Sequence, residues 1–433
     1  MALVIITILL PLVFLIIDIY KERKIYSPSV IFNAIFFVTL FLYSFKLSYI
    51  QQDLSNTTLW CLFLCEIGFN IPIVISYFIK KKDNASYNKP IIINELADKA
   101  IKEKNNEDEF FVLNKKLEFG IFVFVFILFV FEVIICKGFP LLWKFVENEE
   151  RVYFDFTVSK ITIWFHALIT LMGAYSLVKP IKEDLFPNLF YKGFYLMIPV
   201  LIISRQMLIA MVVEAFILYL ITKKNKPKDF YIYCVLGVIL GILGFSAIGN
   251  MRTGEDMFLI VSKFKDSCKY VPTAFKWVYS YMCFSISNLN NLISIAQPGI
   301  TNGVLTWNDI MPSMFDIQNT YSFDYLVNSQ FTVSTFAPSL YLDFGIFGVG
   351  AFCLIIGVVS QFVFKKMEKV KVLSIVYAII TYSLVFLFFV NMFFNFQVIC
   401  QVVFTILIFV VLNNFIEKKS KKLKIKNSQG GKI

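Results

Sequence analysis

The stretch LFYKGFYLMIPVLIISRQMLIAMVVEAFILYLITKK, residues 189–224, decides the architecture of this chain. It is apolar over about 34 residues, whereas one membrane crossing needs about 20. Lysines flank it on both sides, so both ends are expected on the same side of the membrane and the stretch must fold as a hairpin. Two full crossings need about 40 residues. We therefore expect the turn, at residues 204–206, to lie slightly below the membrane surface.

The whole composition agrees with a membrane environment. The chain has 433 residues, of which 58% are hydrophobic, and a mean hydropathy of +0.72; a soluble domain would expose too much of that apolar surface to water. The first apolar segment lacks a basic start and a cleavage site, and is expected to be a retained helix. We predict one all-α, polytopic membrane unit over residues 1–433 with about eleven transmembrane helices, near residues 2–19, 30–50, 57–79, 117–136, 161–178, 188–203, 206–222, 230–249, 340–364, 372–392 and 396–414.

The distribution of positive charge predicts the orientation. The net charge is +11, and most of the 41 lysine and arginine residues lie in alternate connections between the apolar stretches. This pattern argues against a nucleic-acid partner and, by the positive-inside rule, predicts an N-terminus outside and a cytoplasmic C-terminus. The non-membrane segments are then a cytoplasmic linker (80–116), a short outer loop (137–160), a large outer loop with short helices (250–338) and a basic cytoplasmic tail (415–433).

The large outer loop contains an aromatic-rich stretch, residues 269–295, in which Tyr270, Trp277, Tyr281 and Phe284 follow a helix-like spacing. We expect it to pack on the membrane surface or over a cavity. Aromatic rings of this kind concentrate at membrane interfaces, and they also stack on the apolar faces of sugars. Both roles remain open for these residues.

Arginine is rare, and its placement is informative. Only four of the positive residues are arginines, and Arg151, Arg205 and Arg252 all fall on the predicted outer side. A guanidinium offers planar, bidentate donors that match phosphate oxygens. Arg205 lies in the turn of the hairpin, where a charge is costly unless it is paired or lines a wet cavity. The alternative is an arginine whose side chain reaches back to the interface.

A second irregular stretch is TVSTFAPSLYLDFGIFGVGAF, residues 332–352. Pro338 is expected to begin a helix and Asp343 to occupy its first turns, where the helix dipole favours an anion. Gly345, Gly348 and Gly350 would permit close packing against neighbouring helices. Asp343 is a candidate general base, and its alternative role is to satisfy the dipole or to pair with an arginine.

Four motifs together resemble the bacterial oligosaccharide repeat-unit polymerases, the Wzy-type O-antigen and capsule polymerases. They are RVYFDF (151–156), SRQMLIAM (204–211), YSYMCFSISNLNNL (279–292) and, above all, TFAPSLYLDFGIFG (335–348). The plan of many helices with one large outer loop late in the chain covers nearly the whole sequence. A repeated Arg-x10-Gly element of some members is absent, because Phe216 and Lys263 stand where its glycines would be.

The resemblance implies a glycosyltransferase of the bacterial plasma membrane. It would act on undecaprenyl-pyrophosphate-linked glycan donors and acceptors among membrane lipids, with a flippase and a chain-length regulator as candidate protein partners. Cations near the scissile bond would stabilise the departing pyrophosphate. We predict Arg205, Arg252 and Asp343 as catalytic residues, and the substrate-binding residues to be Arg151, Tyr281, Asn288 and Tyr341. No cofactor and no metal is expected.

Rival functions differ in their sequence signatures. A lipid-linked oligosaccharide flippase, or another membrane transporter, should show two similar halves. A permease could use Glu66, Glu214 and His166 as a proton relay, although the single histidine could equally serve helix packing. An O-antigen ligase would carry a histidine in its large outer loop, and this loop has none. The eight cysteines lie mostly in apolar runs and show no metal-binding spacing.

Overall fold

The computed structural model describes nine parts of the chain, residues 2–22, 24–86, 113–144, 155–158, 161–179, 185–223, 230–311, 315–318 and 324–416. Over these residues the fold is helical, as predicted. The described parts contain no β-strand, only isolated bridges that pair Ser48 with Phe264 and Thr335 with Val390.

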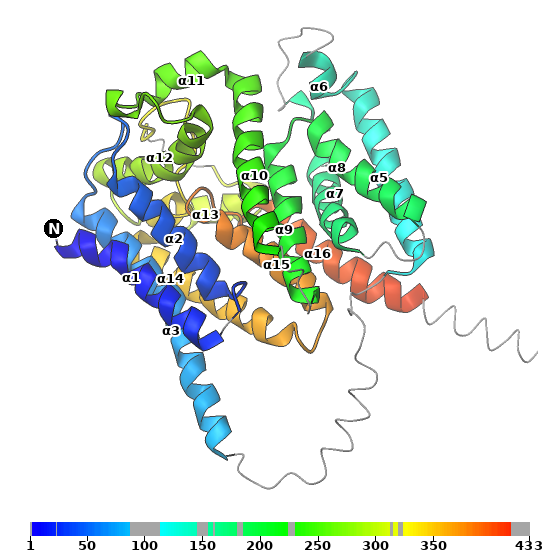
Figure 1. Cartoon of the computed structure of the whole chain (residues 1–433), viewed down its shortest axis with the longest axis horizontal. Helices are drawn as coiled ribbons and strands as arrows, with labels where there is room; N and C mark the ends of the chain where they lie inside the picture. The colour runs from blue at the N-terminus through cyan, green and yellow to red at the C-terminus, as the bar shows by residue number, and fades with distance from the viewer. Residues whose placement is uncertain are drawn as a thin grey trace, which may run out of the picture.

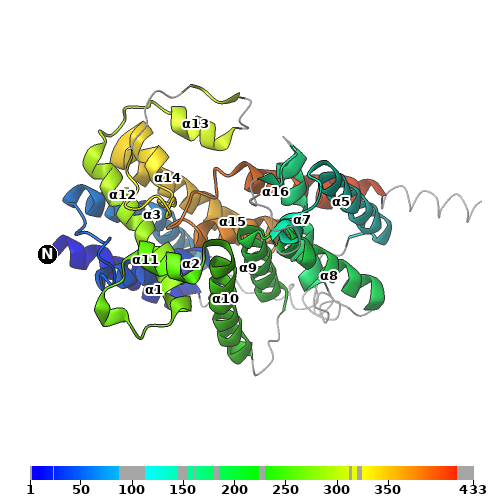
Figure 2. The same ribbon diagram turned by 90° about the horizontal axis from the view of Figure 1, so that it is seen from above.

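The helices gather into a bundle in which α1–α3 and α14 form one side and α5, α7 and α8 the other (Figures 1 and 2). α9, α15 and α10 lie between these sides. The elements, in chain order, are α1 (Ala2–Glu22), α2 (Pro28–Ser44), α3 (Asn56–Ser86), α5 (Lys115–Ile135), α6 (Pro140–Leu142), α7 (Ile161–Val178), α8 (Leu185–Leu201), α9 (Arg205–Thr222), α10 (Phe230–Thr253), α11 (Glu255–Ser262), η3 (Asp266–Cys268), α12 (Thr273–Ile295), α13 (Val304–Ile310), α14 (Pro338–Lys366), α15 (Val372–Val385), α16 (Phe396–Thr405) and η5 (Ile406–Leu412).

A helix occupies each of the eleven stretches predicted to cross the membrane. Among the described residues seven helices are long and apolar enough to do so, or eight if the bent pair α10 and α11 counts as one span. The pair bends by 98°. The others, α2, α8 and α15, have 17, 17 and 14 residues. The protein therefore has the character of a polytopic membrane protein, while the count of eleven spans and the orientation stay predictions.

The predicted hairpin is present. α8 ends at Leu201 and α9 begins at Arg205, with a tight turn between them in which Ile203 has a positive φ of 53°. Ser204 caps α9, because its hydroxyl accepts a hydrogen bond from the backbone N–H of Met207. Arg205 is therefore the first residue of the second helix, directly at the turn.

Glycines bring α3 and α14 into close contact. A Cβ on Gly68 of α3 would lie 2.4 Å from the carbonyl oxygen of Gly350, and a Cβ on Gly357 of α14 would lie 2.5 Å from that of Phe69. Small residues allow helix backbones to approach in this way inside a membrane. Of the three glycines predicted to serve such packing, Gly350 does so, whereas Gly348 makes room for Phe344 of its own helix.

Gly345 has a different function, since it breaks α14 near its start. Its φ of 67° and ψ of −166° are not helical and lie in a region that only glycine occupies readily. The break frees two carbonyl groups of the first helical turns, and the backbone N–H groups of Gly299 and Thr301 donate to those of Tyr341 and Leu342 at 3.2 and 3.1 Å. The irregular start of α14 thus attaches the segment before α13 to the bundle.

The segment predicted as the large outer loop, residues 250–338, holds the end of α10 and also α11, η3, α12 and α13. α12 is not short, since it has 23 residues. It packs against α10, α2 and α3. Trp277 and Phe284 are buried, whereas Tyr270 precedes the helix and is 92% exposed. The predicted linker begins inside α3, which continues to Ser86, and most of that linker and of the basic tail lie outside the described residues.

Candidate functional site

A cavity of about 570 Å³ lies next to the turn between α8 and α9. Its walls come from five places in the chain: the start of α9, the last turns of α10, the middle of α12, residues 330–333, and the turn that joins α15 to α16. Arg205, Phe245, Tyr281, Phe331 and Asn395 are among the residues that line it. The cavity is thus the meeting point of segments far apart in the sequence.

Arg205 presents its guanidinium to aromatic faces in this cavity. The guanidinium carbon lies 5.0 Å from the ring centroid of Phe245 and 5.7 Å from that of Tyr281, within the range of cation–π attraction. Nη2 donates a long hydrogen bond of 3.5 Å to the hydroxyl of Tyr281. Nη1 is buried and has no hydrogen-bond partner among the described residues.

Acidic groups do not neutralise this charge in the part of the chain that the structure describes. The ion pairs found there join Lys24 to Glu368, Lys46 to Asp53 and Lys179 to Glu118, and none involves Arg205. A partly buried guanidinium without a counter-charge is costly. The cavity is therefore receptive to an anion, and the free Nη1 supplies a donor for it.

Tyr281 organises the aromatic side of the cavity. Its ring stacks on Phe389 at a centroid distance of 5.2 Å and makes edge contacts with Phe245 at 5.1 Å and Phe331 at 6.4 Å. These rings come from three different segments, and such contacts fix their relative orientation. Arg205 was predicted as a catalytic residue and Tyr281 as a substrate-binding residue, and the structure brings their side chains together; the two roles stay predictions.

The depth of the cavity follows from α10. Phe245, beneath the Arg205 guanidinium, lies eight residues before the end of the helix at Thr253, which also lines the cavity. At 1.5 Å per residue this separation is about 12 Å. Arg205 is therefore recessed by about two helical turns relative to the end of α10, while its depth below the membrane surface stays a prediction.

Asn288 of α12 supports the cavity wall and does not line the cavity. Its Nδ2 donates to the carbonyl oxygens of Phe331 and Val333, both at 2.7 Å, and its Oδ1 accepts from the backbone N–H of Val327 at 2.8 Å. The side chain is fully buried. With these contacts Asn288 fixes residues 327–333, of which Phe331 and Val333 face the cavity.

Asp343 and Tyr341 lie elsewhere, near α13. The carboxylate of Asp343 accepts hydrogen bonds from the backbone N–H groups of Thr306, at 2.6 Å, and Leu305, at 3.3 Å, and from the hydroxyl of Thr301. It therefore caps α13, and it is 3% exposed. The hydroxyl of Tyr341 faces the carbonyl oxygen of Ala296 at 3.5 Å. Neither residue lines the cavity around Arg205.

Two predicted site residues have no described side chain. Arg151 lies outside the described residues, and of Arg252 only the backbone is described, in the last turn of α10. Arg252 directly precedes Thr253, which lines the cavity. The predicted contributions of these two arginines stay predictions.

Sequence reasoning missed the turn between α15 and α16. A helix was expected over residues 372–392, but α15 ends at Val385 and residues 386–395 are not helical. Six residues of this segment line the cavity: Phe386, Phe388, Phe389, Val390, Met392 and Asn395. Non-helical backbone at membrane depth is tolerated where protein covers it or where it lines a cavity. The two polar residues Asn391 and Asn395, inside an otherwise apolar run, could have indicated a break in the helix at this place. Phe245 and Gln206 also line the cavity, but nothing in the sequence had marked either of them as a candidate site residue.

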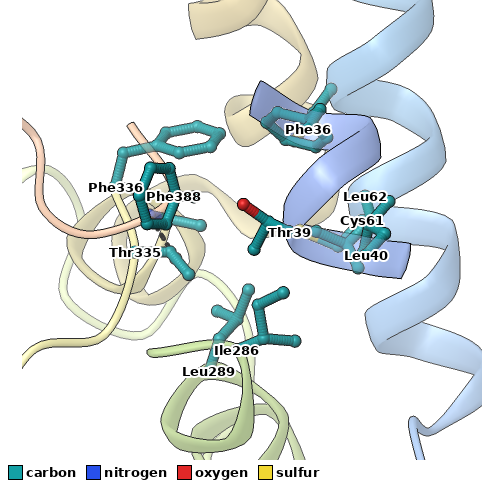
Figure 3. A pocket seen from close by; sticks show the side chains of 12 residues that line it. Phe36, Thr39, Leu40, Cys61, Leu62, Ile286, Leu289, Thr335, Phe336 and Phe388 are labelled. Carbon is teal, nitrogen blue, oxygen red and sulfur yellow. Dashed lines mark hydrogen bonds between the residues drawn. The ribbon is translucent and has the colours of Figure 1, made fainter. Parts of the chain in front are cut away.

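A second, much smaller pocket lies beyond Phe388, between α2, α3, α12 and residues 335–337 (Figure 3). Its volume is about 10 Å³, which suffices for about one water molecule. The hydroxyl of Thr39 points into this apolar space, and its oxygen is buried without a partner among the described residues. The pocket is too small for a substrate.

The groups of the proton-relay alternative are distributed over three helices. Glu66 belongs to α3, His166 to α7 and Glu214 to α9, and all three are buried. Glu214 accepts a hydrogen bond from Nε2 of Gln401 at 3.2 Å, and no hydrogen bond joins any two of the three among the described contacts. None of them lines the Arg205 cavity.

The described residues contain no group of three or more His, Cys, Asp or Glu side chains arranged to hold a metal ion. Comparison with known proteins adds no relative: no protein-family model matches the chain, and neither a curated protein nor a solved structure does.

Proposed function

We propose that this protein polymerises undecaprenyl-pyrophosphate-linked oligosaccharide repeat units into O-antigen or capsular polysaccharide at the outer face of the bacterial plasma membrane. The observation that supports this proposal most is the Arg205 guanidinium. It is recessed in a cavity of about 570 Å³, lies against Phe245 and Tyr281, and has a buried donor without a protein partner. The four sequence motifs supply the family resemblance.

In the proposed reaction a sugar hydroxyl of a fresh lipid-linked unit attacks the anomeric carbon of the growing glycan. The bond from that carbon to the phosphate oxygen breaks, the lipid pyrophosphate leaves with the electron pair, and the hydroxyl proton passes to water or to a phosphate oxygen. Negative charge grows on the leaving group, and a preorganised guanidinium in a recessed site stabilises it there. Arg205 would bind that group, and Arg252, next to Thr253, would assist.

The aromatic walls suit the sugar part of such a substrate. Tyr281, Phe389 and Phe331 present ring faces and edges along the cavity beside Arg205, and such surfaces stack on the apolar faces of sugars. We assign Asp343 to the capping of α13 in this proposal, because its carboxylate is occupied there. The acceptor hydroxyl would then be activated mainly by its position relative to the anomeric carbon.

The test is the length of the surface glycan in cells whose own gene is replaced by a variant. Arg205→Lys keeps the charge but loses the bidentate donors, so we expect long chains to disappear while single repeat units remain on the surface and the protein level is unchanged. Tyr281→Phe keeps the ring contacts and should shorten the chains less. Lys269→Gln, at an exposed lysine on the segment before α12, controls for simple loss of a positive charge.

The outcomes separate the alternatives. Long chains of normal length in Arg205→Lys would exclude Arg205 from pyrophosphate binding. Loss of all surface glycan upon gene deletion, including single repeat units, would indicate a flippase instead of a polymerase.

A further inference from the structure

One side of α14 is apolar and exposed along most of the helix. Beyond the break at Gly345, the side chains of Phe347, Ile355, Val358 and Phe362 are spaced by eight, three and four residues and lie on one side. All four are more than half exposed, and Phe347 is 77% exposed. α14 is one of the helices long and apolar enough to cross a membrane. In a membrane this side of α14 meets the lipid acyl chains, since no described segment covers it.

α13 extends this surface beyond the start of α14, and the two helices are in contact (Figure 2). The N-cap of α13, Gly303, lies against the ring of Phe344, to which a Cβ on the glycine would be 3.4 Å. The carboxylate of Asp343 holds the first turn of α13 through the N–H groups of Leu305 and Thr306. Phe344 is itself 51% exposed. α13 is therefore fixed beside an exposed aromatic ring of α14.

Two side chains of α13 hold a further apolar segment in place. Nε1 of Trp307 donates to the carbonyl oxygen of Phe315 at 3.0 Å. The Asn308 side chain bonds both backbone groups of Ile317, at 2.9 and 2.8 Å. The side chains of Trp307, Phe315 and Ile317 are nevertheless 43%, 56% and 48% exposed. The structure thus fixes the backbone that carries three apolar side chains while it leaves those side chains uncovered.

These side chains continue the lipid-facing side of α14. Trp307 lies one turn after Gly303 on the same face of α13, so its ring follows the exposed ring of Phe344. Single apolar side chains on a surface need no partner, whereas a continuous exposed patch indicates one. The bilayer already covers the adjoining side of α14. A tryptophan whose N–H is bonded and whose ring is exposed is also typical of a membrane–water interface.

We infer that α13 and residues 315–318 form an interfacial anchor, in which Trp307, Phe315 and Ile317 insert into the membrane surface beside the start of α14. Residues 301–318 contain no lysine or arginine, so the contact is made with the apolar part of the lipid and needs no anionic headgroup. The anchor sets the height of α13, and with it the start of α14, relative to the membrane. It is independent of the chemistry proposed at Arg205.

The backbone at Ile317 provides a matched pair of positions for a test. Its N–H and C=O both point to the Asn308 side chain, as in an extended strand, where successive side chains lie on opposite sides. Gln318 is exposed and is expected on the side away from the lipid. A label at residue 317 should therefore meet lipid, and a label at residue 318 should meet water.

The test uses the full-length protein in phosphatidylcholine nanodiscs, with a fluorescent nitrobenzoxadiazole label on Ile317→Cys or on Gln318→Cys. Cys136→Ser and Cys234→Ser in both proteins leave only buried native cysteines. An interfacial segment buries its apolar side about 5–10 Å deep, so a nitroxide near the top of the acyl chain should quench the label at 317 about threefold more than the label at 318. Iodide in the water should show the reverse order.

Equal quenching of the two labels by the nitroxide lipid overturns the anchor, as does quenching of the label at 317 by iodide alone. Protection of the label at 317 from both quenchers would show that a protein segment or a second copy of the chain covers this surface, which also overturns the inference. Monodisperse elution of both labelled proteins excludes misfolding as the cause of a difference.

Discussion

Asn288 is joined to Val333 across the wall of the Arg205 cavity, with its Nδ2 donating to the Val333 carbonyl oxygen at 2.7 Å. The same amide also binds Phe331 and Val327. A single buried side chain of α12 therefore sets the path of the segment that closes the cavity. Asn288 therefore stabilises the cavity wall, although the sequence had predicted it as a substrate-binding residue.

Asn288→Ala should destabilise the protein by roughly 2–4 kcal/mol, because it leaves two backbone carbonyls and one N–H in a buried region without their partner. The effect is measured by heating the purified protein in detergent and determining, at each temperature, the fraction that remains monodisperse. Asn291→Ala is the control on the same helix, since the Asn291 side chain donates one hydrogen bond to the backbone, to the carbonyl oxygen of Tyr325, and its loss should cost less. Equal stability of the two variants would contradict this structural assignment.

Asp343→Asn should retain long-chain glycan, because an amide oxygen can still accept the hydrogen bond from the Thr306 N–H. Asp343→Ala removes the cap of α13, and a lost cap costs about 0.5–2 kcal/mol. Glycan length in cells and thermal stability of the purified variants check the two expectations. Loss of polymerisation in a stable, well-expressed Asp343→Asn protein would restore the carboxylate as a candidate base.

Gly345→Ala should destabilise the start of α14 by about 1–3 kcal/mol, because a side chain is strained at the φ and ψ of Gly345. Limited proteolysis of the segment before α13 is a local measure, since the break at Gly345 is what frees the carbonyls that hold that segment. Gly193→Ala, in α8 and facing open space, should be neutral or slightly stabilising. Similar proteolysis patterns for both variants would refute the anchoring role.

Gly68→Ala should separate α3 from α14, since the added Cβ would lie 2.4 Å from a backbone oxygen of Gly350 that cannot move independently. Overpacking of this kind costs about 1–3 kcal/mol. The expected result is a lower melting temperature, with Gly120→Ala, at a glycine that faces open space, as the control. An unchanged melting temperature would mean that the two helices have room to adjust.

Much of the fold could be predicted because the length of an apolar run and the charges beside it indicate a helix without knowledge of the rest of the structure. The hairpin followed from the length of the apolar run and the lysines on both flanks. Its turn comprises residues 202–204, slightly before the predicted 204–206, so Arg205 and Gln206 already belong to α9. The end of α15 at Val385 was not predictable in this way, since aromatic residues 386–389 continue the apolar run and only the tertiary fold makes them line a cavity. Of the residues that line the cavity, Arg205 and Tyr281 had been singled out from their chemistry. Phe245 could not, because one phenylalanine among 50 becomes informative only by its position beneath a guanidinium.

α15 has only 14 residues and is therefore about 21 Å long, shorter than the apolar layer of a membrane, which is about 30 Å thick. Where water fills the cavity above it, nearly all of the transmembrane voltage drops across the remaining thickness beneath. A pyrophosphate that leaves Arg205 through this water then crosses almost none of the electric field. Polymerisation at such a site would be electrically silent, and its rate should persist in cells whose membrane potential has been collapsed by an ionophore.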